Sequence, residues 1–245
     1  MNMKLRHFSL IAGTLMAACP ALADSDGSPP THEEPAYKFT LGRYALSDHS
    51  VGWDANLRRA AGDGHAWIGF FRLADQDTSQ WRGGWDGSYG SSVRLAPSIQ
   101  VASGGFVGGS LQIETGETWF AGTGLGRTNL RNYWNLNFDP NDSYTLYAGH
   151  RGAGSSLAMV QLVADNRLNP DQKHLHFLWR QGLEDGRRLT LDALFKRGMV
   201  DDRLIQRWGL ALTHDWPSWF LRLAFDPNAN FNSQDMWRLS AGVRF

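Results

Sequence analysis

Trp237-Arg-Leu-Ser-Ala-Gly-Val-Arg-Phe245 ends the sequence in strict alternation of apolar and polar residues. Successive side chains of an extended strand point to opposite sides. One face therefore carries Trp237, Leu239, Ala241, Val243 and Phe245, and the other carries Arg238, Ser240, Gly242 and Arg244. This pattern favours a strand between lipid and water, although a half-buried sheet of a soluble protein alternates as well.

The stretch 237–245 resembles the closing strand of bacterial outer-membrane β-barrels. The resemblance implies that Phe245 is part of the signal read by the barrel-assembly machinery. It also implies an up-and-down antiparallel barrel in the Gram-negative envelope, in contact with outer-membrane lipid and lipopolysaccharide.

The amino terminus supports export. Lys4, Arg6 and His7 precede a short apolar stretch, and Ala21-Leu22-Ala23 offers a small-x-small cleavage site, so residues 1–23 are predicted to be a cleaved signal peptide. Residues 24–36 are polar and rich in proline, which predicts a disordered periplasmic lead-in. Residues 37–245 are then the single barrel domain.

Composition excludes several classes of protein. The only cysteine is Cys19, inside the predicted signal peptide, so the mature chain has no disulfide framework and no thiolate site. Mean hydropathy is −0.38, and no apolar run approaches the roughly 20 residues of a transmembrane helix. The 27 glycines and 11 tryptophans fit a barrel in which only alternate residues meet lipid.

Alternating segments follow one another from Tyr37 onwards and predict twelve to fourteen strands. Ile99 to Ile113 keeps one parity through Gly104-Gly105 and is interpreted as one long strand. Residues 131–138 are interpreted as a strand that ends at a tight turn beginning at Asp139.

Turn lengths predict the orientation of the barrel. Residues 165–172, 198–204 and 227–234 are interpreted as long outer loops, whereas 184–186 and 215–218 are short periplasmic turns. Tryptophans near the strand ends favour interfacial girdles over the alternative of a soluble β-sandwich or lipocalin-like barrel. They are Trp53, Trp81, Trp119, Trp134, Trp179, Trp208, Trp219 and Trp237.

The polar faces of the expected strands carry more basic than acidic residues. The predicted lumen-lining residues are Arg82, Arg180, Arg188, Arg207, Arg222, Arg238, His174 and His176, with Lys38, Arg58, Lys196 and Arg244 on the same faces. The acids on these faces are Asp54, Asp86, Glu114 and Asp192. The arginines either form a path for anions or pair with these acids and fill a closed lumen.

Catalytic and metal signals are weak in the sequence. His174 and His176 share one strand face, but no third ligand stands at useful spacing, so no metal or other cofactor is predicted. His49 and Ser50 are adjacent and would point apart on a strand, which argues against a serine hydrolase. The glycine runs lack the lysine of a phosphate loop, and nothing indicates nucleic-acid binding.

The hypothesis that follows is an outer-membrane barrel with an arginine-lined channel for anionic solutes such as acidic sugars. Its size and basic lining resemble the small monomeric sugar-acid porins. A closed barrel that anchors an envelope export system and a surface lipid-modifying hydrolase remain the alternatives.

Overall fold

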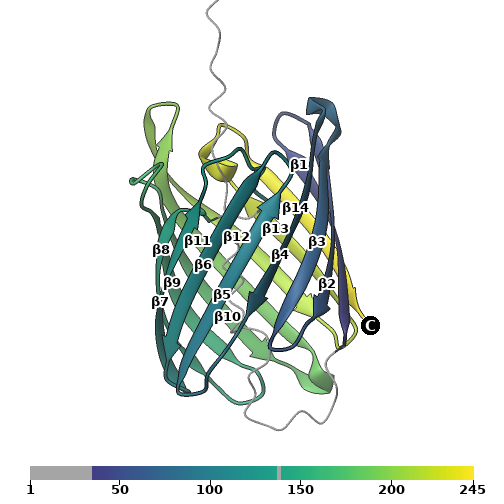
Figure 1. Cartoon of the computed structure of the whole chain (residues 1–245), viewed down its shortest axis with the longest axis vertical. Helices are drawn as coiled ribbons and strands as arrows, with labels where there is room; N and C mark the ends of the chain where they lie inside the picture. Colours follow the sequence, from purple (N-terminus) through teal and green to yellow (C-terminus); the bar gives the residue numbers. More distant parts are fainter. Residues whose placement is uncertain (1–34, 137–138) are drawn as a thin grey trace, which may run out of the picture.

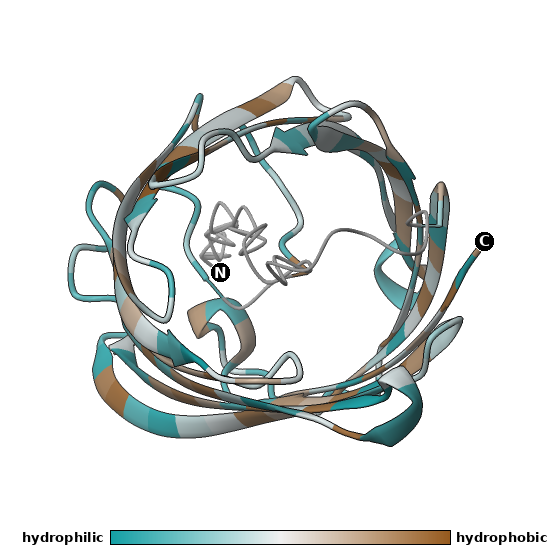
Figure 2. Ribbon diagram, turned by 90° about the horizontal axis from the view of Figure 1, so that it is seen from below, coloured by the Kyte–Doolittle hydropathy of each residue, from teal (hydrophilic) through white to brown (hydrophobic). Residues whose placement is uncertain are grey.

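In the computed structural model, which describes residues 35–136 and 139–245, the chain is a closed barrel of fourteen antiparallel strands (Figure 1). Every strand pairs with its neighbours in sequence, and β1 pairs with β14 to close the ring (Figure 2). The predicted all-β, up-and-down barrel is therefore confirmed. The predicted signal peptide and nearly all of the predicted lead-in lie outside the described residues.

The strands are β1 (Tyr37–Leu46), β2 (Val51–Ala60), β3 (Gly64–Leu73), β4 (Thr78–Gly87), β5 (Val93–Ala102), β6 (Phe106–Thr115), β7 (Trp119–Thr128), β8 (Ser143–Arg151), β9 (Leu157–Asp165), β10 (Lys173–Gly182), β11 (Arg188–Val200), β12 (Arg203–Asp215), β13 (Trp219–Asp226) and β14 (Met236–Arg244). In the part of the chain that the structure describes, three short 3₁₀ turns join strands: η2 (Ala74–Gln76), η3 (Glu184–Gly186) and η4 (Ala229–Phe231). Among the described residues, no helix has the length and apolarity of a membrane span.

The two faces of the closing strand have the predicted orientation. Trp237 and Leu239 are 52% and 49% exposed on the outside of the barrel, whereas Arg238 and Ser240 are 7% exposed on the inside. The apolar face continues around the wall, because Leu191, Leu212, Leu223 and Leu239 lie side by side on four neighbouring strands. Such an outward apolar surface is that of a barrel that spans a membrane.

Tyr37 and Phe245 form the end of the seam between β1 and β14. The Tyr37 amide donates to the Phe245 carbonyl at 2.8 Å, and the Phe245 amide donates back at 3.0 Å. The two rings stack with centroids 5.7 Å apart. The first and last strands are thus held together by backbone pairing and by an aromatic contact.

Two strand predictions are wrong. The stretch from Ile99 to Ile113 is a hairpin of β5 and β6 whose turn contains Gly104 and Gly105, both at positive φ (85° and 79°). Residues 131–136 of the predicted strand 131–138 belong to the connection between β7 and β8 and form no strand, while 137 and 138 are outside the described residues.

Two finer expectations also need correction. The predicted long loop 198–204 is the tip of an extended hairpin, in which β11 and β12 pair as far as Val200 and Arg203. Trp134 is not part of an outer girdle, because it stacks on Phe71 inside the barrel with ring centroids 5.7 Å apart. The other seven tryptophans are between 43% and 75% exposed.

Candidate functional site

A cavity inside the barrel is lined mainly by inward side chains of β1 to β5, β13 and β14, and the space in it that is not filled by protein atoms, open solvent included, is about 1090 Å³. Its basic residues are Lys38, Arg58, Arg82, Arg222 and Arg238, and its acidic residues are Asp54 and Asp86. Thr40, Asn56, Ser98, Gln100 and Ser240 add neutral hydrogen-bonding groups. The cavity therefore combines excess positive charge with hydroxyl and amide groups.

Three basic residues lie in one row across the seam of the barrel. Lys38 on β1 lies directly opposite Arg244 on β14 and Arg58 on β2. Arg244 pairs with Asp215 at 2.5 Å, and Arg58 pairs with Asp86. Lys38 instead lies over the Phe220 ring, with its Nζ 4.7 Å from the centroid, and among the described residues no carboxylate pairs with it. Like charges directly opposite each other on neighbouring strands are unfavourable. Asp215 and Asp86 offset two of the three charges, which leaves Lys38 as the uncompensated cation of this row among the described residues.

In a second row of directly opposed residues, two arginines donate hydrogen bonds to threonine hydroxyl groups. Arg180, Thr190, Thr213 and Arg222 are directly opposed on β10 to β13. Arg222 donates from Nε to the Thr213 Oγ1 at 2.8 Å, and Arg180 donates from Nε to the Thr190 Oγ1 at 3.3 Å. Within the described residues, Arg222 forms no ion pair, so the neutral threonine orients the guanidinium without cancelling its charge.

Other lumen charges are paired, as the closed-lumen alternative predicts. Arg82 pairs with Asp54, and Lys196 pairs with Asp226 at 2.5 Å. Glu114 lies 2.7 Å from Arg151 and 3.5 Å from Arg94. Asp215 and Asp226 lie at strand ends and were not among the four acids expected in the lumen. They supply two of the ion pairs.

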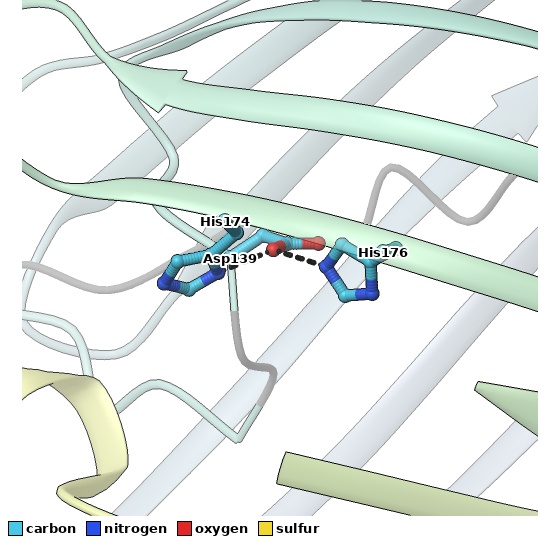
Figure 3. A group of neighbouring side chains, drawn as sticks. All are labelled: Asp139, His174 and His176. Atoms are coloured by element: carbon cyan, nitrogen blue, oxygen red, sulfur yellow. Dashed lines mark hydrogen bonds and ion pairs between the residues drawn. The ribbon is translucent and has the colours of Figure 1, made fainter. Parts of the chain in front are cut away.

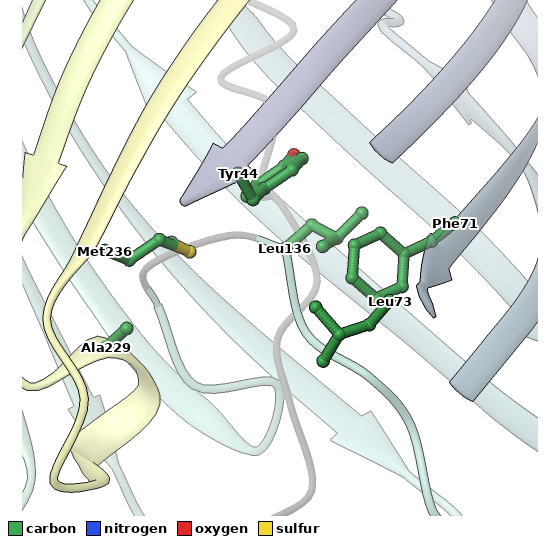
Figure 4. Close-up of a cluster of buried hydrophobic side chains, with 6 residues drawn as sticks. All are labelled: Tyr44, Phe71, Leu73, Leu136, Ala229 and Met236. Atoms are coloured by element: carbon green, nitrogen blue, oxygen red, sulfur yellow. The ribbon is translucent and has the colours of Figure 1, made fainter. Parts of the chain in front are cut away.

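Residues 129–136 of the connection between β7 and β8 fold into the barrel and reach the opposite wall. Leu136 packs among residues of β1, β3, β14 and η4 (Figure 4). These are Tyr44, Phe71, Leu73, Ala229 and Met236. The buried Arg238 donates from Nη1 to the Leu136 carbonyl at 3.0 Å, and Tyr133 stacks on Phe106 with ring centroids 4.3 Å apart. Residues 129–136 thus narrow the lumen, and Tyr133 and Leu136 line the cavity.

The same connection brings a carboxylate to the two histidines of β10 (Figure 3). Asp139 Oδ1 is 2.6 Å from His174 Nδ1 and 2.9 Å from His176 Nε2. Burial raises the pKa of the Asp139 carboxyl, but the contacts with His176 and His174 outweigh burial and hold the pKa well below its usual range. Asp139 was not expected as a partner of these histidines, because its position beside a proline and an asparagine predicts only a turn.

The predicted lumen arginines do not form one continuous group. Arg180 and Arg222 share the threonine row, whereas Arg82 and Arg238 are buried against Asp54 and the Leu136 carbonyl. Arg188 lies near the short η3 turn, opposite Asp215. Arg207 is exposed on the extension of β12 beyond its pairing with β13, which begins at Leu210.

Ser50, which was considered above for a hydrolase, and His150 on β8 have other contacts. Ser50 donates from Oγ to Asp48 Oδ1 at 2.6 Å, and this hydrogen bond lowers the pKa of the Asp48 carboxyl. The His150 ring packs against Trp119 with centroids 4.6 Å apart. Neither contact joins a serine to an imidazole.

An outer-membrane protein and two porins are among the solved structures that resemble this fold. The outer-membrane protein Omp33 of Acinetobacter baumannii aligns over 86% of this chain and 99% of its own, with TM-score 0.54 and 10% sequence identity. The KdgM porin covers 85% of this chain and 99% of its own at TM-score 0.47 and 9% identity. The NanC porin covers 84% and 100% at TM-score 0.47 and 7% identity. No protein-family model and no curated protein match the sequence. The similarity to Omp33 shows that the chain has the fold of an outer-membrane β-barrel.

Proposed function

We propose that this barrel conducts small anionic solutes, such as acidic sugars, and that Lys38 and Arg222 bind the anion in transit. The observation that carries the proposal is that these two cations border the cavity without a carboxylate partner among the described residues. Five basic against two acidic residues leave the cavity wall positively charged. In a narrow space with apolar surroundings, such a wall concentrates anions and repels cations.

The chemistry of the wall suits a sugar carboxylate. Arg222 uses Nε for Thr213, which leaves its terminal nitrogens as a planar donor pair that matches a carboxylate. Lys38 supplies a second, more mobile positive charge. Thr40, Asn56, Gln100 and Ser240 line the same cavity and can hydrogen-bond sugar hydroxyl groups.

Planar-bilayer recording of the purified protein under a potassium chloride gradient tests the proposal. We expect channels whose reversal potential lies close to the equilibrium potential of chloride. Adding glucuronate should reduce the chloride current, whereas adding glucose should not. Replacing Lys38 and Arg222 together with glutamine should shift the reversal potential towards cations. The shift should be larger at 0.1 M salt, where the screening length is about 10 Å, than at 1 M, where it is about 3 Å.

Arg187→Gln is the matched control. Arg187 lies at a short turn and contacts Asp185, which is 85% exposed, so its loss should leave selectivity unchanged. If the purified wild-type barrel passes no ionic current, the channel proposal is wrong. A conducting barrel whose selectivity survives the loss of both Lys38 and Arg222 would overturn their assignment.

A closed structural barrel is the second candidate, and the cluster around Leu136 favours it. This cluster joins residues of the wall to the inward-folded connection between β7 and β8 and so obstructs the lumen. If the barrel is closed, wild-type protein is silent, while deletion of residues 131–136 opens it to ions. If it is a channel, the same deletion raises an existing conductance.

A further inference from the structure

We propose that Asp139, His174 and His176 form a binding site for a divalent transition-metal ion, with zinc as its chemical match. The site lies inside the barrel, between β10 and the connection that joins β7 to β8 (Figure 3). The proposal does not depend on whether the barrel conducts.

The donor atoms already converge. The three donor atoms, one from each residue, lie within 4.8 Å of one another, and both histidines contact the same Asp139 oxygen, at 2.6 and 2.9 Å. Zinc bonds to nitrogen and carboxylate oxygen of about 2.0–2.1 Å place tetrahedral ligands roughly 3.3 Å apart. The two histidine nitrogens therefore have to move about 0.4–0.7 Å away from the Asp139 oxygen to admit an ion, and water completes the fourth position.

A second carboxylate orients one of the rings. His176 faces Asp139 with Nε2, and its Nδ1 lies 3.0 and 3.1 Å from the two oxygens of Asp192 on the neighbouring strand β11. A histidine that holds a metal with one nitrogen usually donates the other N–H to a carboxylate, which fixes the tautomer and makes the ring a stronger ligand. Asp192 is placed to do this for His176.

Burial and charge also suit a divalent ion. His174 and His176 are 1% and 7% exposed, so few water molecules compete for the donors. One divalent cation balances Asp139 and Asp192 while both imidazoles stay neutral. Lys196, which lies opposite His174 on β11, already has its charge balanced by Asp226 at 2.5 Å. The mixture of imidazole and carboxylate favours zinc, copper or nickel over magnesium or calcium, which prefer oxygen alone.

An ion at this site would join parts of the chain that are far apart in sequence. His174 and His176 belong to the barrel wall, whereas Asp139 belongs to a segment with no strand pairing of its own. Metal binding would therefore hold the connection against β10.

The test uses tag-free protein in detergent, treated with a chelator and then freed of it. We expect calorimetric titration with zinc chloride to show one ion bound per chain. Titration with cobalt chloride should produce the visible absorption bands of tetrahedral Co²⁺, and zinc should abolish them. If wild-type protein binds neither ion, or gives only the spectrum of hydrated Co²⁺, the metal-site proposal is wrong. The three residues would then be an ion-paired His–Asp cluster.

Single substitutions then assign the ligands. Asp139→Asn and His176→Gln should each lower zinc affinity at least tenfold, and Asp192→Asn should lower it by about 10- to 100-fold, as for other partners of metal-bound histidines. His65→Gln is the control, because His65 also lies near a carboxylate, Asp86 at 3.5 Å, but elsewhere in the barrel. Circular dichroism and heat-modifiable gel mobility verify folding of each variant. Equal zinc affinity in the wild type and in folded Asp139→Asn and His176→Gln proteins would overturn the assignment.

Discussion

At the scale of single residues, the seam contact between Tyr37 and Phe245 has the clearest consequence. Deleting Phe245, or replacing it with aspartate, removes the stacked ring, and deletion also removes two backbone hydrogen bonds. We expect both variants to reduce the amount of folded barrel in the outer membrane. Immunoblotting of membrane fractions measures this, and Phe245→Tyr, which keeps the ring, is the control. Wild-type levels of the aspartate variant would show that the terminal ring is dispensable.

A charge introduced on the outer face of the barrel should destabilise the protein more than a charge introduced on its inner face. Leu212 is 44% exposed in the outer row of leucines, so Leu212→Arg places a charge in the hydrocarbon and should destabilise the barrel by about 2–4 kcal/mol. Ala211→Arg, one residue away, points inwards and opposite Asp192, and should cost far less. Urea unfolding in detergent micelles compares the two. Equal costs would contradict the inside–outside assignment.

The face of the barrel wall on which a residue lies could be predicted from the sequence, but its interaction partners could not. Alternation placed Lys38, Arg82, Arg222 and Arg238 on the inside, because the side-chain period of a strand is local information. The pairing of Arg244 with Asp215 depends on the register between strands. The meeting of Asp139 with His176 depends on how a non-strand segment crosses the lumen. Neither is visible in spacing along the chain.

At the scale of elements, two errors compensated in the strand count. The hairpin of β5 and β6 was merged because Val101 lies directly opposite Val107, so equal parity is expected across the hairpin as well as along one strand. The segment 131–136 carries large apolar residues because Tyr133 and Leu136 are buried inside the barrel rather than in its wall. One strand was lost and one gained, which is why the upper count of fourteen agrees with the structure.

Tag insertion tests which end of the barrel faces the outside. Tags at Asn169-Pro170 and Asp201-Asp202 lie in connections at the end opposite Phe245, and should be detected by antibody on intact cells. A tag at Asp185-Gly186 should be detected only after permeabilisation. The connection at Asn228-Ala229 is unsuitable, because Ala229 and Phe231 are 2% and 4% exposed in the interior. The reverse labelling pattern would show that the barrel has the opposite orientation in the membrane.

At the scale of the whole molecule, the closed ring predicts the behaviour of the purified protein. A barrel with every strand paired resists detergent until it is heated, so unheated and boiled samples should migrate differently in electrophoresis. Mass spectrometry of the outer-membrane form should give an amino terminus at Asp24, as expected if residues 1–23 are removed. Identical mobilities, or recovery in the soluble periplasmic fraction, would contradict the assignment.

The architecture was more predictable than the function for a physical reason. Barrel formation requires an alternating pattern repeated in every strand, and that pattern is distributed over most of the sequence. Conduction through the proposed channel would depend on a few groups in the lumen, such as Lys38, which has no carboxylate partner among the described residues, and Leu136, which belongs to the segment that narrows the lumen. These few positions are settled by three-dimensional packing, and the fold alone does not determine them.

The seam also determines when the barrel can finish folding. β1 and β14 are the first and last strands, so the hydrogen bonds between Tyr37 and Phe245 span almost the entire folded chain. Contacts between residues so distant in sequence form slowly, because the entropy of closing the intervening chain is lost before the contacts compensate for it. Until then the sheet has two open edges that can pair with other chains and aggregate. The rate of ring closure should therefore limit the yield of refolded protein, and that yield should fall as protein concentration rises.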